Sequence, residues 1–90
     1  MDRTDDRPTP AAEDAATESV VLRQLLDLHP AQLTLAELSR EIGGENAGFA
    51  ERDAIERAVR DLAGAGLLHH HDTFVLPTRA ALRFSELLDR

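Results

Sequence analysis

The apolar residues of this 90-residue chain recur at helical spacing except in one segment, LLHHHDTFVLP (67–77). In that segment Phe74 and Val75 favour strand, and residues 68–71 can pair with them across a turn near residues 71–73. The turn holds no glycine or asparagine, so the sequence predicts neither its type nor the strand register. Pro77 is expected to end the second strand, because proline has no N–H to donate to a strand ladder. A single short hairpin among helices predicts a mostly α fold with a small β-hairpin, which is an α+β class.

The remaining apolar residues predict four helices, in the order helix, helix, helix, hairpin, helix. Their expected spans are about 17–28, 35–42, 51–65 and 79–89. Thr17 or Ser19 is expected to cap the first helix. The second has the clearest start, since Thr34 is an N-cap and Glu37, three residues on, completes a capping box. Gly43 is expected to end that helix in the left-handed conformation.

Glycine and threonine mark the other helix ends. Gly66 fits the left-handed position of a Schellman cap after the third helix, with Leu67 reaching back to Leu62. Thr78 is expected to cap the last helix. The glycine-rich loop between the second and third helices has one large apolar residue, Phe49, which we expect to tuck into the core.

Charge and composition restrict the function. The chain holds 17 acidic residues against 10 arginines and no lysine, for a net charge of −7, and it has no cysteine. Disulfides and thiolate metal sites are therefore excluded, and no apolar run approaches the roughly 20 residues that span a bilayer. The acidic N-terminus lacks the apolar region of a signal peptide, so we expect a soluble cytoplasmic protein that does not contact the membrane.

Residues 1–16 differ in composition from the rest of the chain. They are rich in proline, alanine, threonine and charge, and hold no large apolar residue after Met1. Such a segment buries too little surface to offset the entropy lost on ordering. We expect a flexible acidic tail here, with at most a frayed helix from about Ala11, and a single domain over residues 17–90.

Three stretches of the sequence carry a resemblance to a known family: TLAELSREIG (34–43), AIERAVRDLAGAGLL (54–68) and FVLPTRAAL (74–82). Together they resemble the winged helix-turn-helix domain of small bacterial transcription regulators. The resemblance implies that the third helix is a recognition helix, that the hairpin is the wing, and that the chain binds double-stranded DNA as a transcription regulator. The DNA contacts that it implies come from Arg52, Arg57, Arg60, His70 and Arg79.

The last helix has an apolar face made of Phe84, Leu87 and Leu88. This face either packs on the first helix or extends into a seam with a second copy or another protein. The resemblance favours a homodimer, since small winged-helix regulators often dimerise through terminal helices.

The chain departs from that family in its turn and in its charge. The connection between the second and third helices spans about eight residues, instead of three or four. The third helix holds four acids and three arginines over residues 51–61, and the hairpin has no arginine or lysine. The alternative function is therefore a winged helix used as a protein–protein interaction or dimerisation module without DNA binding.

The placement of the arginines distinguishes the two functions. DNA binding by an acidic chain requires segregated charge, and the residues available for one basic side are Arg40, Arg52, Arg57, Arg79 and Arg83. Arg57 can instead pair with Asp53, four residues earlier on the same helix. Arg60 stands in the same relation to Glu56.

The histidine run HHH (69–71) lacks the geometry of a metal site. On a strand His69 and His71 face one way and His70 the other, whereas zinc requires three or four convergent ligands. No nucleophile–base pair, carboxylate pair or phosphate-binding glycine loop is visible either. We therefore expect no metal, no cofactor and no enzymatic activity.

Overall fold

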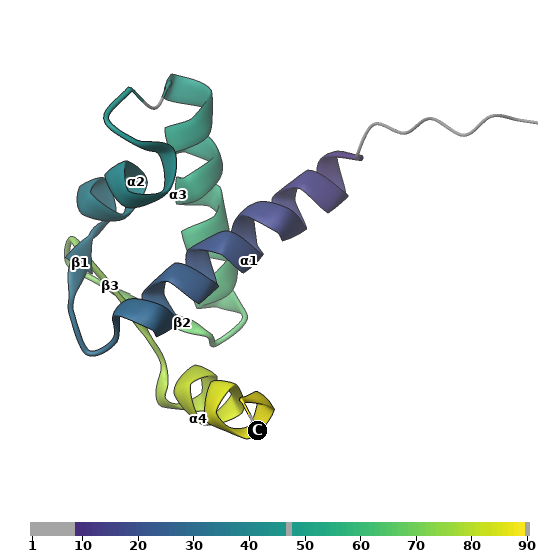
Figure 1. Cartoon of the computed structure of the whole chain (residues 1–90). Coiled ribbons are helices and arrows are strands. Elements are labelled where there is room, and N and C mark those ends of the chain that lie inside the picture. The colour runs from purple at the N-terminus through teal and green to yellow at the C-terminus, as the bar shows by residue number, and fades with distance from the viewer. Residues whose placement is uncertain (1–8, 47, 90) are drawn as a thin grey trace, which may run out of the picture.

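The computed structural model describes residues 9–46 and 48–89. Within these residues four helices and three strands follow one another: α1 (Pro10–Leu28), β1 (Leu33–Thr34), α2 (Leu35–Gly43), α3 (Phe49–Gly64), β2 (Leu68–His71), β3 (Phe74–Pro77) and α4 (Arg79–Leu88). The strands form an antiparallel sheet in the order β1-β3-β2 (Figure 1). The predicted α+β class is confirmed, and so is the hairpin between the third and fourth helices.

The hairpin has a two-residue turn. His71 pairs with Phe74, so the turn consists of Asp72 and Thr73. Asp72 adopts a φ of 58°, a left-handed conformation that aspartate tolerates better than most residues because its short side chain can hydrogen-bond locally.

Strand β1 is an element that the sequence did not predict. Leu33 pairs with Val75 and Thr34 with Phe74, and the Leu35 N–H donates to the Thr73 carbonyl at 3.0 Å. Two residues are too few to show a strand period, which is why the pattern did not reveal β1. The strand attaches the start of α2 to the hairpin.

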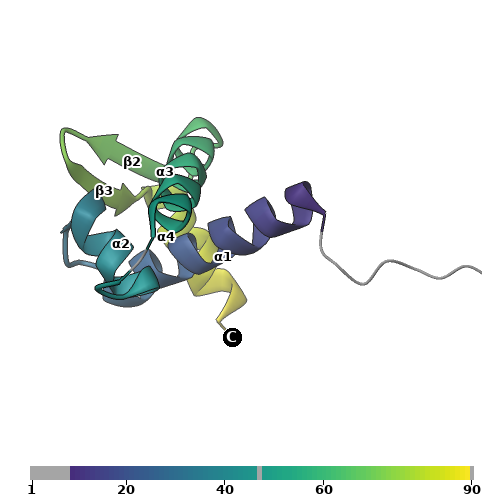
Figure 2. The same cartoon turned by 90° about the horizontal axis from the view of Figure 1, so that it is seen from above.

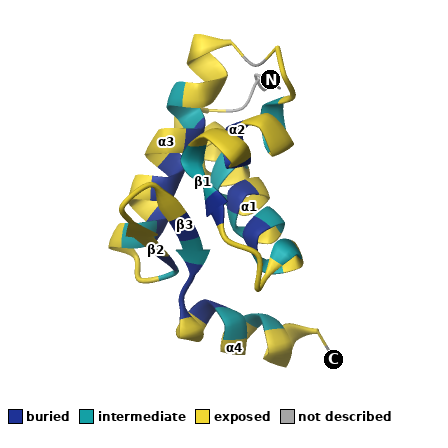
Figure 3. Cartoon of the chain, turned by 90° about the vertical axis from the view of Figure 1, so that its left-hand side faces the viewer, coloured by how far each residue is buried: buried dark blue, intermediate teal, exposed yellow. Residues whose placement is uncertain are grey.

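The core lies where α1, α2 and α3 meet the sheet. The largest fully buried side chains are Leu25, Leu38, Val21, Val59 and Val75. Helices α1 and α3 pack side by side (Figures 1 and 2), and buried residues cluster on their facing sides and on β3 (Figure 3). The buried residues of α3 are Ile55, Ala58, Val59 and Leu62, which lie on one face at helical spacing.

Helix α1 begins earlier than predicted. It starts at Pro10 rather than about residue 17, and its N-cap is Thr9, whose hydroxyl accepts from the Ala12 N–H at 3.1 Å. Proline is suited to the first helical position, where its missing N–H would be unpaired in any case. The predicted flexible tail therefore overlaps a helix over residues 10–16, all of them exposed, while residues 1–8 lie outside the described residues.

The connection between α2 and α3 also differs from the prediction. Gly43 is the last residue of α2, and Gly44 is the left-handed one, with φ 78°. Helix α3 already starts at Phe49, so the connection shortens to residues 44–48. Phe49 is 78% exposed and does not enter the core. Its position six residues before the buried Ile55 places it about 120° round the helix from that residue.

The end of α3 and the start of α4 are capped as predicted. Gly66 has φ 86°, its N–H donates to Ala63, and the Leu67 N–H donates to the Leu62 carbonyl at 2.9 Å, which is a Schellman cap. Thr78 caps α4 by accepting from the Ala81 N–H at 3.1 Å. The Thr78 hydroxyl donates to the Gly66 carbonyl at 2.8 Å, so one side chain joins the two helix ends.

Helix α4 lies apart from the main body of the domain (Figures 1 and 3). Ala81 is its one buried residue. Across the described ranges 9–46 and 48–89, no helix combines the length and apolar character needed to cross a membrane.

Candidate nucleic-acid interface

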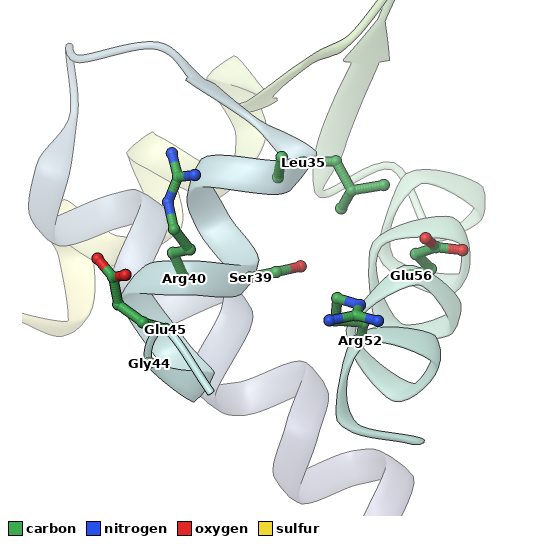
Figure 4. Close-up of a pocket in the computed structure, with 8 residues that line it drawn as sticks. Leu35, Ser39, Arg40, Gly44, Glu45, Arg52 and Glu56 are labelled. Atoms are coloured by element: carbon green, nitrogen blue, oxygen red, sulfur yellow. The ribbon is translucent and has the colours of Figure 1, made fainter. Parts of the chain in front are cut away.

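An open groove separates α2 from α3 near the N-terminal end of α3. Its volume is about 430 Å³, and its lining residues are Leu35, Ala36, Ser39, Arg40, Gly44, Glu45, Arg52 and Glu56. Figure 4 shows Ser39 and Arg52 on opposite walls, with Arg40 and Glu45 together on the α2 side. Two arginines from successive helices therefore border one groove, and each has a glutamate nearby.

Arg57 does not share this groove with Arg52. Five residues separate them, which turns the two side chains about 140° apart on α3. Arg57 instead forms an ion pair with Asp53 on its own helix, as predicted, and a second one with Asp14 of α1 at 3.5 Å. Arg57 thus lies between two carboxylates on the side of α3 that faces the start of α1.

Arg60 is exposed and lies between the other two arginines around α3, about 80° from Arg52 and about 60° from Arg57. Both Arg60 and Glu56 belong to the described chain, and no ion pair joins them. The predicted Glu56–Arg60 pair is therefore wrong. The side chain of Arg60 is available on the outward side of the helix.

His70 lies on β2, and Arg79 is the first residue of α4. His70 borders a shallow hollow with the turn residues Asp72 and Thr73 and with the start of α2. Arg79 follows Thr78, whose hydroxyl is bonded to Gly66 beyond the end of α3. That end is roughly 20 Å along the helix axis from Arg52. The five residues predicted to contact DNA are therefore distributed over several faces.

The structure does not collect the arginines on one basic side. Arg40 and Arg52 share the groove, Arg57 faces α1, and Arg79 and Arg83 belong to α4. Arg83 is paired with Glu86 at 3.1 Å. In the groove Arg40 and Arg52 are accompanied by Glu45 and Glu56, so the described arginines show little of the charge segregation that DNA binding requires.

Asp14 is the site residue that the sequence interpretation missed. It belongs to the segment predicted to be a flexible tail, yet it contacts Arg57. The signal was its spacing: Asp14 lies seven residues before the buried Val21, which is two helical turns along the same stripe. A helix that begins at Pro10 places this carboxylate on the same stripe as the buried Val21.

The histidines of β2 are all exposed. The residues described by the structure include no group of three or more His, Asp or Glu side chains arranged to hold a metal ion.

A second groove, of about 570 Å³, lies between α1 and α4. Its apolar lining comes from Leu22, Leu26, Leu67, Ala81, Phe84 and Leu88. Charges of both signs border it, with Arg23 and Asp27 on α1 and Asp89 after α4. Phe84 is 60% exposed and Leu88 69%, so α1 covers the predicted apolar face of α4 only in part. Leu87, the third residue of that face, is also exposed.

Comparisons of this chain with family models, with curated proteins and with solved structures give no match.

Proposed function

We propose that the chain is a winged helix-turn-helix domain that binds double-stranded DNA as a small transcription regulator. The order of elements supports the proposal, because α2 and α3 follow one another across residues 44–48 and the β2–β3 hairpin comes after α3, where the wing of this family would lie. The observation that carries the proposal is the pair Arg40 and Arg52 at the open groove between these helices. Base contacts in such motifs come from the N-terminal residues of the second helix, where Arg52 lies.

In this proposal the DNA contacts come from the groove and from the outward side of α3. Arg52 and Arg60 point toward the major groove, where an arginine holds guanine bidentately or pairs with phosphate. Arg40 contacts a phosphate from the α2 side. Glu45 and Glu56 oppose phosphate, so the affinity is modest and falls steeply as salt releases the few cation–phosphate contacts.

A salt-dependent titration of the full chain against labelled duplex DNA tests the proposal. Arg52→Ala is expected to weaken binding by about 1–3 kcal/mol if Arg52 reads a base. Arg83→Ala removes the same charge from α4, where Arg83 pairs with Glu86, and serves as the matched control. Denaturation midpoints of both variants show that the fold is retained.

Two results would contradict the proposal. If the wild-type chain fails to bind duplex DNA at about 50 mM salt, where non-specific attraction is still strong, the DNA-binding function is wrong. Equal losses in Arg52→Ala and Arg83→Ala would show a general charge effect instead of an interface at the groove.

A second candidate function, dimerisation without DNA binding, is favoured by the apolar groove between α1 and α4. We propose that its occupant is a second copy of the chain. In a two-fold interface the same patch meets itself, so apolar residues meet apolar residues, and a rim of both signs can pair with its own copy. A domain this small rarely nets more than about 3–5 kcal/mol from its own core, so the added interface stabilises it.

A further inference from the structure

The core-facing stripe of α1 continues beyond the core as an acidic position. Val21 is the first buried residue of the helix, and residues 10–16 are all exposed. Asp14 lies on the same stripe as Val21, two turns earlier. The start of α1 therefore presents a carboxylate to α3 where the rest of the helix presents leucine and valine.

The Asp14 carboxylate contacts Arg57, which lies on the side of α3 that faces away from the hydrophobic core. The Asp14 Oδ1 atom lies 3.5 Å from Arg57 Nη2, and Arg57 also bonds to Asp53. The Arg57 side chain is 45% exposed and that of Asp14 50%. Arg57 lies two residues after the buried Ile55, about 200° round the helix and so on the outer side. A phosphate approaching that side would compete with Asp14 for the same guanidinium.

We propose that the first turns of α1 are an autoinhibitory arm, in which Asp14 occupies Arg57 and withholds it from a DNA phosphate. This inference rests on the proposed DNA-binding function. No apolar side chain anchors residues 10–16, and an exposed ion pair contributes only about 0.2–1 kcal/mol. A phosphate can therefore displace the arm, while Asp53 stays beside Arg57 because both belong to α3.

The arm lowers DNA affinity by a measurable but limited factor. An exposed pair of that strength corresponds to about a two- to fivefold change in the equilibrium constant at the upper part of its range. Arg57 freed from Asp14 keeps its pair with Asp53 and adds one phosphate contact through its other nitrogen, which steepens the slope of log K against log salt by about 0.9 at most. The combination of tighter binding and a steeper slope separates a new contact from a simple change in net charge.

The test compares two neutralised carboxylates in the full chain. Asp14→Asn is expected to bind labelled duplex DNA about two- to fivefold more tightly than wild type, with the steeper salt slope. Glu41→Gln is the matched control, because it removes the same charge from a carboxylate that accepts from Gln24 of α1. Adding Arg57→Gln to Asp14→Asn is expected to abolish the gain.

Every other outcome contradicts the proposed autoinhibitory arm. An equal gain in Asp14→Asn and Glu41→Gln reduces the effect to net charge, and a gain that survives Arg57→Gln removes Arg57 from it. Wild-type binding that Asp14→Asn leaves unchanged rejects the arm but keeps DNA binding. If neither protein binds at about 50 mM salt, the proposed function fails and the arm fails with it.

Discussion

Threonine side chains cap the N-termini of three helices of the described chain, and the three caps are not equivalent. Thr9, Thr34 and Thr78 each accept a backbone N–H three residues on at 3.1 Å. Thr34 adds the reciprocal half of a capping box, in which its N–H donates to Glu37 at 2.9 Å. Thr78 is the buried one, 8% exposed, and its hydroxyl also donates to Gly66. Its removal therefore costs two hydrogen bonds.

We expect Thr34→Ala to lower the free energy of unfolding by about 1 kcal/mol, the usual cost of losing an N-cap. Thr78→Ala is expected to cost more, by the roughly 0.5–1.5 kcal/mol of one further hydrogen bond. Thr78→Ser keeps both bonds and is the control. Urea denaturation of the three variants measures the differences, and an equal cost for the two alanine variants would show that the bond to Gly66 contributes nothing.

Helix α1 consists of two parts held in different ways. From Val21 onward it packs into the core, whereas residues 10–16 are exposed. The first part depends on the cap from Thr9 and the ion pair between Asp14 and Arg57. Segments with few buried contacts open at low free-energy cost, so the two parts differ in local stability.

Amide hydrogen exchange should show this difference directly. We expect weak protection over residues 10–16 and strong protection over residues 21–28. Thr9→Ala should reduce the far-ultraviolet helix signal without moving the denaturation midpoint, because the core is untouched. Protection of residues 10–16 equal to that of the core part would show that contacts other than Asp14–Arg57 hold this segment.

Elements defined by local signals could be predicted from the sequence, and those defined by distant partners could not. The capping box at Thr34 and the Schellman cap at Gly66 depend on a few neighbouring residues, and both are present. Strand β1 requires β3 as a partner forty residues away. Apolar spacing does not predict the start of α1, because residues 10–16 hold no large apolar residue and only the local Thr9–Pro10 cap marks it.

The candidate site shows the same limit. The sequence identified Arg52 and Arg57 on one helix, and their spacing of five residues turns them about 140° apart. Only the structure shows that Arg52 borders the groove with α2 while Arg57 contacts Asp14 of α1. The partner of Arg57 comes from a segment that composition alone assigned to a tail. Helical spacing gives angles around one helix, whereas the contact between Asp14 and Arg57 depends on how α1 crosses α3 (Figure 2).

At the scale of the whole molecule, α4 is the least integrated helix. Its apolar face borders the groove with α1, and Phe84, Leu87 and Leu88 remain more than half exposed. Exposed apolar patches bordered by charge are typical of interaction surfaces. This region is therefore where we expect a second copy to bind.

Sedimentation velocity at increasing protein concentration tests that expectation. The wild-type chain should shift toward a dimer, and Phe84→Asp should shift it back to a monomer. Phe49→Asp is the matched control, because Phe49 is also an exposed phenylalanine but belongs to α3 and lines neither groove. A wild-type chain that stays monomeric throughout, or an equal effect of both variants, would reject the dimer.

The hydrogen bonds of Thr78 fix the position of α4 relative to α3. Its hydroxyl and its N–H are bonded to the carbonyls of Gly66 and Leu67, just beyond the end of α3. In a dimer joined through α4, the distance between the two α3 helices would depend on these Thr78 hydrogen bonds in each copy. DNA offers successive major-groove faces about 34 Å apart. One residue inserted next to Thr78 would then change which operator spacing the pair can span, with every DNA-facing side chain left intact.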